Sequence, residues 1–379
     1  MRKWIRILFL GGYQFAYTKI ARPLIFRNNP QQAHEKTLQL LRGLDERKWT
    51  YPLLKMTHGA AFQVRPIEVG GVRLAHPMIL AAGFVKGQGF GNEDEALSAV
   101  DQTIIPGWRS MPLLVGAVEF GSFTRWPRMG NTGTAIWRDV PTQSTQNRIG
   151  LKNPGAQAAA EFLARRKKAL PLVFGINIAV SPGVTDAEQE KCEVVESIAF
   201  FLARGIRPAW LTLNLSCPNT EDDPGAHQTA SRARDLCHAV VELVQDIPLW
   251  VKIGPDLADQ QYQALLRIFE ETKVRAVIAT NTLGQPTPDN LNITAGVGGG
   301  KLHSKAVEVV KLLMAEKQRQ GYQLDIIGCG GVMDGQTYAD FTRHGIKAMQ
   351  YWSALVYRGP LVAAIIQHEK DTYGIGNSD

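Results

Sequence analysis

The segment Trp210-Leu-Thr-Leu-Asn-Leu-Ser-Cys-Pro-Asn-Thr220 changes character halfway along its length. Residues 210–215 are apolar and rich in strand-forming side chains, which predicts a buried strand. The second half is polar and turns at a proline, so the strand delivers a thiol between two amides: Asn214, Cys217 and Asn219. A free cysteine is often just a small buried apolar residue, but the polar setting of Cys217 favours a functional thiol.

The same pattern, a short apolar run followed by a helical stretch, recurs along the chain. The runs that predict strands are 78–82, 115–121, 173–178, 210–215, 249–253, 276–280, 324–328 and 348–351. Helical periodicity separates most of them, at 155–167, 188–203, 230–245, 259–271, 305–317 and 335–344. Eight such repeats predict the α/β class, as a (β/α)8 TIM barrel with an N-terminal helical extension. A doubly wound dinucleotide-binding sheet is disfavoured, because no G-x-G-x-x-G motif follows the first strand.

Length and composition are compatible with a large core. The chain has 379 residues, of which 45% are apolar, so disorder is not expected. We predict two domains, a membrane-associating helical extension over 1–60 and a catalytic barrel over 61–379. Within the barrel, 87–107 is interpreted as a helix plus an insertion without an assigned role.

The cysteines do not indicate a metal site. The four cysteines are Cys192, Cys217, Cys237 and Cys329. They form no C-x-x-C pair and no zinc-like spacing with histidine, so we predict reduced thiols and no bound metal.

Positive charge is concentrated at the N-terminus. Six cations and no acid precede Glu35, and subtracting these six from the net charge of +7 leaves +1 for the rest of the chain. A nucleic-acid surface would need basic residues spread over a face, so no nucleic acid is expected as a partner. The uncharged run 7–18 is too short to span a bilayer. Together with its aromatic residues, the segment 1–27 predicts an interfacial membrane helix, with a signal peptide or a helix packed on its own domain as alternatives.

Residues 30–57 are predicted to be helical. Asn29-Pro30 is a helix start signal, and alanine and leucine residues form an apolar stripe behind it.

The motif Asn214-Leu-Ser-Cys-Pro-Asn219 resembles the catalytic-base motif of the dihydroorotate dehydrogenases, FMN enzymes of pyrimidine biosynthesis. The resemblance extends over roughly 25–370. It implies oxidation of dihydroorotate to orotate, in which Cys217 takes a proton from ring carbon C5 while a hydride passes from C6 to the flavin. Lys252 would stabilise the reduced flavin. A lysine inside an apolar strand requires a negative partner, and an internal acid is the alternative to the flavin.

The resemblance also assigns the residues that hold the flavin. Glycine-rich turns after the last two strands would expose backbone N–H groups to the phosphate, and an asparagine in the third strand would need a polar partner. The assigned residues are Ala82, Gly83, Lys86, Ser122, Asn177, Asn214, Lys252, Thr280, Gly300, Gly330, Gly331, Trp352 and Ser353.

A second set is implied for dihydroorotate. Amide side chains both donate and accept hydrogen bonds, so they can pair with the alternating donors and acceptors of a cyclic pyrimidine dione. The residues are Lys86, Asn147, Arg148, Ile149, Gly150, Leu151, Asn214, Asn219, Asn281 and Thr282.

The chain combines features of two branches of this family. Cys217 and Leu151 are typical of the soluble branch, whereas the segment Phe26–His34 is similar to the N-terminal extension of the quinone-linked branch. Two features depart from the family pattern. Val85 stands where the family usually has an acidic residue before the lysine, and Trp352 and Ala354 replace the tyrosine and glycine of its usual Tyr-Ser-Gly. We favour a quinone as electron acceptor and a peripheral position on the cytoplasmic side of a membrane, because electron delivery there explains residues 1–57.

Two alternatives remain open. One is a soluble-acceptor enzyme of the fumarate type, or a relative acting on another pyrimidine. The other is a catalytically idle membrane-bound flavoprotein. The oligomeric state is not predicted.

Overall fold

The structure is a computed structural model that describes residues 2–216 and 228–372. Cys217 and Asn219 lie outside the described residues.

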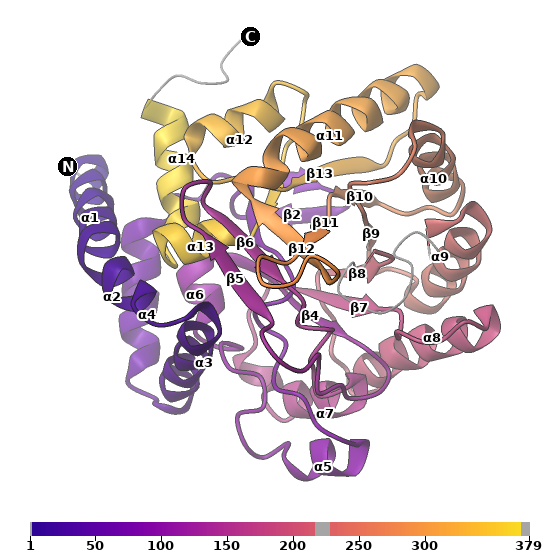
Figure 1. The fold of residues 1–379 in the computed structure, drawn as a ribbon, viewed down its shortest axis with the longest axis horizontal. Coiled ribbons are helices and arrows are strands. Elements are labelled where there is room, and N and C mark those ends of the chain that lie inside the picture. The colour runs from indigo at the N-terminus through magenta and orange to yellow at the C-terminus, as the bar shows by residue number, and fades with distance from the viewer. Residues whose placement is uncertain (1, 217–227, 373–379) are drawn as a thin grey trace.

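Eight parallel strands close into a barrel, as predicted from the sequence (Figure 1). They follow one another around the barrel in chain order, and each differs from its predicted range by two residues at most. The strands are β3 (Met78–Leu80), β4 (Ala117–Phe123), β7 (Gly175–Ala179), β8 (Trp210–Asn214), β9 (Leu249–Ile253), β10 (Ala276–Ala279), β13 (Asp325–Cys329) and β14 (Met349–Tyr351).

Helices surround the barrel and bury their apolar faces against it. All six predicted helices of this region are present. They are α7 (Ala156–Ala164), α8 (Ala187–Ala203), α9 (Ala230–Val244), α10 (Asp259–Glu271), α11 (Gly300–Gln320) and α12 (Gly335–Thr342), and α13 (Ser353–Arg358) and α14 (Val362–Thr372) follow β14. In α10, the spacing of Tyr262, Leu265, Leu266 and Phe269 places all four in the core. Burying each such side chain stabilises the fold by about 1.5–3 kcal/mol.

The predicted helix plus insertion at 87–107 contains one short helix, α5 (Glu93–Ser98). A second, α6 (Met111–Val115), follows it before β4 begins.

A hairpin of β1 (Ile67–Val69) and β2 (Val72–Leu74) closes the amino end of the barrel. The rings of Trp210 and Trp250 stack there with centroids 4.6 Å apart. Trp250 Nε1 donates to the carbonyl of Gly70 at 3.0 Å. A Cβ atom at Gly175 would run into the Trp210 ring, so the stack depends on glycine at that position. This end is therefore filled with side chains, and an open cavity can form only at the other end.

A four-stranded antiparallel sheet borders the carboxyl end of the barrel (Figure 1). Its order is β11-β12-β6-β5, from β5 (Ile136–Asp139), β6 (Ser144–Asn147), β11 (Leu283–Pro286) and β12 (Thr294–Gly299). The sequence analysis does not predict this sheet. Its strands are short, and β6 and β12 consist mainly of polar and glycine residues, which lack strand propensity.

Helices form the N-terminal region up to Ala61. They are α1 (Arg2–Ala16), a π-helical turn over Tyr17–Ala21, α2 (Arg22–Phe26), α3 (Pro30–Glu46) and α4 (Thr50–Ala61). The predicted helical character of 30–57 is confirmed, and the structure divides it into two helices because the chain leaves helical geometry at Arg47. The Asn29 side chain caps α3 by accepting from Gln32 N at 2.8 Å. The domain boundary at residue 60 stays a prediction.

Helix α1 is divided between an inner and an outer face. Leu10 is only 2% exposed, and farther along the Tyr17 hydroxyl donates to the carbonyl of Val356 at 2.9 Å. On the outer face, Trp4 and Leu8 are more than two-thirds exposed. No helix in the described residues is both long and apolar enough to cross a membrane.

Asp45 connects α3 to the segment before α6 through buried hydrogen bonds. Its carboxylate is 5% exposed and accepts from Gly107 N at 2.6 Å and Ser110 N at 2.8 Å. We expect Asp45→Ala to lower the free energy of unfolding by about 1–3 kcal/mol, because it leaves two N–H groups without their acceptor. Denaturant titration measures this. The control is Glu46→Ala, which removes an exposed pair with Arg42 and a hydrogen bond with the Thr103 side chain but leaves no backbone N–H without its acceptor, and should change stability by less than about 1 kcal/mol. Equal effects of the two substitutions would contradict the role of Asp45.

Candidate active site

One cavity opens at the carboxyl ends of the strands, and all eight barrel strands or the residues directly after them contribute to its lining. The antiparallel sheet supplies the remaining wall through Ile136, Thr145 and Asn147 from one hairpin and Gly298 and Gly299 from β12. Because the carboxyl ends of parallel strands meet at one rim, polar groups far apart in sequence are gathered here.

Most residues that the resemblance assigns to flavin or substrate line this cavity. They are Ala82, Gly83, Lys86, Ser122, Asn147, Ile149, Gly150, Leu151, Asn177, Asn214, Lys252, Thr280, Asn281, Thr282, Gly330, Gly331, Trp352 and Ser353.

Two assigned residues with described positions are absent from the lining. The Arg148 guanidinium instead donates to the carbonyl of Thr132 at 3.2 Å. Gly300 lies behind Gly299, where an added Cβ would collide with the carbonyl of Thr142. As a glycine, it lets α11 start close to β6 and has no side chain that could contact a ligand.

The sequence analysis also missed several lining residues. Gln350, Cys329, Thr145 and Gly299 are the ones on which the geometry below depends. A signal was present for Gln350, since a glutamine within the apolar run 348–351 is as costly to bury as an asparagine in β7. Thr145 gave no such signal, because it belongs to the sheet that was not predicted.

Lys252 is buried and forms no direct ion pair with any residue that the structure describes. Its Nζ donates to Gln350 Oε1 at 3.0 Å, and no described carboxylate lies within 4.0 Å of it. The internal acid considered from the sequence therefore does not neutralise Lys252 by contact. Burial raises the pKa of the neighbouring Cys329 thiol, and the positive charge of Lys252 opposes this rise.

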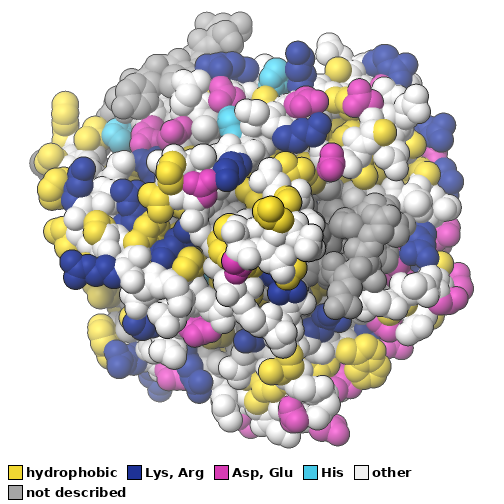
Figure 2. Space-filling model, in the orientation of Figure 1, with side chains coloured by type: hydrophobic (Ala, Val, Ile, Leu, Met, Phe, Trp, Pro, Cys, Tyr) yellow, Lys and Arg dark blue, Asp and Glu magenta, His cyan; other side chains and the backbone are white. Residues whose placement is uncertain are grey.

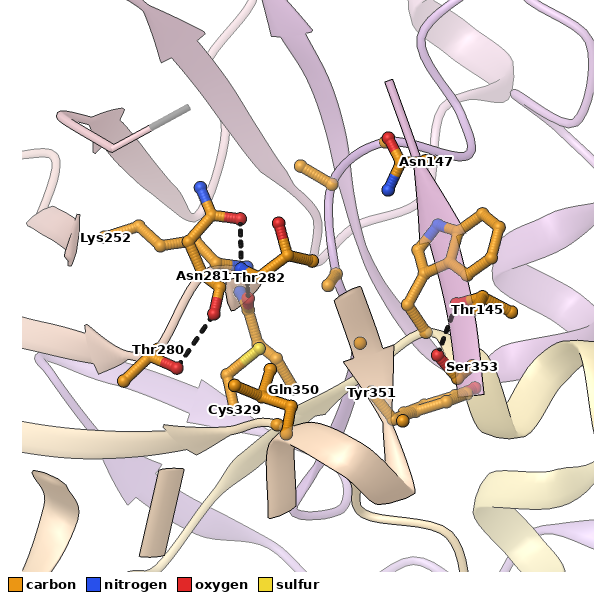
Figure 3. A pocket seen from close by; sticks show the side chains of 18 of the residues that line it. Thr145, Asn147, Lys252, Thr280, Asn281, Thr282, Cys329, Gln350, Tyr351 and Ser353 are labelled. Atoms are coloured by element: carbon orange, nitrogen blue, oxygen red, sulfur yellow. Dashed lines mark hydrogen bonds between the residues drawn. The ribbon is translucent and has the colours of Figure 1, made fainter. Parts of the chain in front are cut away.

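Two asparagines are held together at one side of the cavity. Asn281 donates to the Ser216 carbonyl and, at 3.3 Å, to Asn214 Oδ1. Asn214 in turn donates to Ser122 Oγ at 3.4 Å. Asn147 projects from β6 on the other side (Figure 3). Amide groups thus border the cavity from two directions, as recognition of a flat polar ring requires.

Glycines let three backbone segments approach one another at the far end of the cavity. Gly299, Gly330 and Gly331 have φ angles of 86°, 137° and 69°. A Cβ on Gly331 would lie 2.6 Å from the Gly299 carbonyl oxygen. Beside them, the hydroxyls of Thr145 and Ser353 are 2.7 Å apart (Figure 3). The 21-residue helix α11 begins at this point, so hydroxyls, backbone and a helix N-terminus suit an anion such as a phosphate.

A second cavity, of about 360 Å3, lies between the N-terminal helices and the barrel. Its walls are mainly apolar, with Ala33, Leu41 and Leu44 from α3 and Leu54 from α4. Burial lowers the pKa of His34 in this wall to about 4, and the charges of Lys86 and Lys152 add to the effect. His34 is therefore neutral at physiological pH.

The two cavities share a wall. Ile136, Thr145 and Trp352 line both of them. The Trp352 ring packs edge-on against Phe84, with centroids 6.1 Å apart. A molecule in the apolar cavity would be separated from one in the polar cavity by the thickness of single side chains.

Comparison with known families identifies one match. The family described as "Dihydroorotate dehydrogenase" matches residues 66–372.

Curated relatives match over nearly the full chain. A dihydroorotate dehydrogenase (quinone) from Gloeobacter violaceus is 30% identical over 344 residues, covering 90% of each chain. One from Streptomyces avermitilis is 31% identical and covers 91% of this chain and 90% of its own. Among solved structures, a dihydroorotate dehydrogenase from Eimeria tenella in complex with ferulenol aligns with a TM-score of 0.74. It covers 92% of this chain and 94% of its own, and at 22% identity it supports the shared fold.

Proposed function

This chain belongs to the dihydroorotate dehydrogenase family, and we infer that it oxidises dihydroorotate to orotate with FMN and passes the electrons to a quinone. The observation that carries this inference is the pair of cavities, one polar and one apolar, on either side of a wall that contains Trp352. A flavin in the polar cavity would be within reach of a pyrimidine bound above it and of a quinone beyond the wall. The reaction belongs to pyrimidine biosynthesis.

The polar cavity fits FMN in its donor set. Asn177 Oδ1 is buried and meets no donor among the described residues, which suits a ring N–H. Lys252 supplies the positive charge that a reduced flavin needs, and Gly330, Gly331 and Ser353 supply a place for the phosphate. FMN, when bound, accepts a hydride and can release its electrons one at a time.

The proposed roles of the substrate residues follow from their chemistry. Asn147, Asn214 and Asn281 would orient the pyrimidine ring, and Lys86 would face its carboxylate. Cys217 would accept the proton from C5. An ordinary thiol has a pKa of about 8.5, so it must be partly ionised by its surroundings to serve as a base near neutral pH. Cys217 and Asn219 lie outside the described residues, and their roles rest on the family motif.

The apolar cavity supports a quinone rather than fumarate as acceptor. A dianion would lose its hydration among leucine side chains without gaining a charged partner for each carboxylate. A quinone ring and its isoprenoid tail would lose little hydration free energy on entering this cavity. Neutral His34 could hydrogen-bond a quinone carbonyl, and Arg138, whose guanidinium lies over the Phe26 ring at 4.1 Å, provides a second polar group in the same wall.

The N-terminal helices also support binding to a membrane surface. Hydrophobic and basic side chains gather over them, at the left edge of Figure 2. Trp4, Leu8 and Phe15 are 71%, 74% and 63% exposed. Apolar side chains enter the interface of a bilayer, and each nearby cation adds on the order of 1 kcal/mol with anionic lipids. Quinone would then enter the apolar cavity directly from lipid.

Replacing the base should stop chemistry without emptying the site. Cys217→Ala should bind FMN normally and slow its anaerobic reduction by dihydroorotate by roughly 10²-fold or more, the usual scale for loss of a general base. Stopped-flow absorbance at the flavin band measures this. Cys192→Ala, at an exposed cysteine on α8, is the control. A normal rate in Cys217→Ala would leave the thiol without a catalytic role, and wild-type flavin that dihydroorotate never bleaches would favour the idle flavoprotein.

Filling the apolar cavity should separate the two half-reactions. Ala33 is nearly buried in its wall, so Ala33→Phe should slow reoxidation of the reduced flavin by a long-chain quinone by roughly 10-fold or more through steric exclusion. Reduction by dihydroorotate should be unchanged. Gln39→Phe, on the exposed side of the same helix, controls for the added ring. Faster reoxidation by fumarate than by quinone in the wild type would support the soluble-acceptor alternative.

The exposed apolar side chains should control membrane association. We expect the combined substitution of Trp4, Leu8 and Phe15 by serine to abolish co-sedimentation with vesicles containing anionic lipids, while flavin reduction stays normal. Leu172 and Leu291, exposed elsewhere at 99% and 80%, provide the control when both are changed to serine. If both variants sediment like the wild type, the helices do not bind the bilayer.

A further inference from the structure

A carboxylate lies in the interior of the barrel, outside the lining of either cavity. Glu119, in β4, is fully buried. Four side chains donate hydrogen bonds to it, from Asn177 Nδ2 at 2.7 Å, Trp210 Nε1 at 2.9 Å, Thr212 Oγ1 at 2.6 Å and Gln350 Nε2 at 3.1 Å. The four donors come from three other strands, so Glu119 connects a large part of the barrel wall.

Two of these donors are amides, and the carboxylate determines which way they face. An ionised carboxylate can only accept hydrogen bonds, whereas a primary amide has a donor end and an acceptor end. Asn177 and Gln350 must therefore turn their NH2 groups toward Glu119. Their oxygens necessarily point elsewhere.

The two amide oxygens have different surroundings. Gln350 Oε1 accepts from Lys252 Nζ at 3.0 Å, which completes a chain from a buried cation through an amide to a buried anion. Asn177 Oδ1 is buried without a donor among the described residues, and Asn177 lines the polar cavity. A buried acceptor without a partner is costly unless a ligand supplies the missing N–H.

We propose that Glu119 is a positioning residue, which sets the polarity of Asn177 and Gln350 so that the cavity offers an acceptor for the imide N–H of the flavin ring and a fixed ammonium group at Lys252. This rests on the proposed function, since it takes FMN as the ligand. Glu119 itself touches no ligand and acts through the two amides.

The substitution Glu119→Gln tests the polarity directly. A glutamine keeps the shape but replaces one acceptor oxygen by a donor NH2, so it cannot accept from both amides and the indole and hydroxyl donors together. One amide must rotate. If Asn177 rotates, its NH2 group faces the flavin N–H, donor against donor.

The measurement is the affinity of the apoprotein for added FMN, with flavin fluorescence as the readout. Glu119→Gln should weaken binding by roughly 10-fold or more, the scale of a lost buried hydrogen bond. Thr212→Val is the matched control, because it removes a donor from the same carboxylate without touching an amide, and it should stay within about twofold of the wild type. In the Asn177→Ala background, Glu119→Gln should cause little further loss, since the amide through which it acts is gone.

The outcomes separate the positioning role from a structural one. The proposal is overturned if Glu119→Gln and Thr212→Val bind FMN equally well, or if the losses from Glu119→Gln and Asn177→Ala simply multiply. A change confined to the KM for dihydroorotate would also overturn it. Wild-type apoprotein that fails to bind FMN would instead refute the proposed function.

A second variant covers the case in which Glu119→Gln does not fold. In Asn177→Asp, only a protonated carboxyl can donate to Glu119, and two facing carboxyls hold a proton more tightly than one alone. FMN affinity should then change with pH as that proton is lost, while the wild type, with an amide that does not titrate, should not share this dependence. The charged groups around the pair are Glu119 and, through Gln350, Lys252. A variant with the pH profile of the wild type would contradict the proposed orientation of Asn177.

Discussion

Two opposite charges are buried in the barrel, and the geometry of the polar cavity depends on how each is satisfied. Removing a charge from water is costly unless hydrogen bonds and a counter-charge replace the solvent. Glu119 accepts hydrogen bonds from four side-chain donors, whereas Lys252 donates to one amide oxygen, that of Gln350, and contacts the Cys329 thiol. The anion is therefore well solvated by the protein, and the cation retains donor capacity toward the cavity. This asymmetry suits a site that stabilises negative charge developing on a bound cofactor.

The N-terminal helices have a different physical role from the barrel. The barrel closes without them, and its own loops and strands line the polar cavity. The helices add an apolar space next to it, so that a water-soluble substrate and a lipid-soluble acceptor can reach opposite sides of one wall. Trp352 lies in that wall where the family usually has tyrosine, which makes the partition bulkier and removes a hydroxyl.

Attachment of these helices uses polar contacts as well as apolar packing. Asp45 binds two backbone N–H groups of the segment before α6, and the Tyr17 hydroxyl binds the end of α13. The same helices leave large apolar side chains exposed on their outer face. An element that is firmly packed on one side and apolar on the other is suited to lie between a protein and a bilayer.

The sequence by itself determined the barrel, because each apolar run is short, β-prone and separated from the next by helical periodicity, and these are local properties. It also indicated the chemical groups at the rim, since polar residues such as Asn177 and Lys252 inside apolar runs are costly to bury and conspicuous for that reason. Only the tertiary structure decided the rest. The sheet of β5, β6, β11 and β12 forms from weak strands whose partners are distant in the chain, so its pairing is not encoded locally. The orientation of Asn177 depends on Glu119, 58 residues away. The apolar cavity exists only because α3 packs against β5 of the antiparallel sheet, which no pattern within α3 specifies.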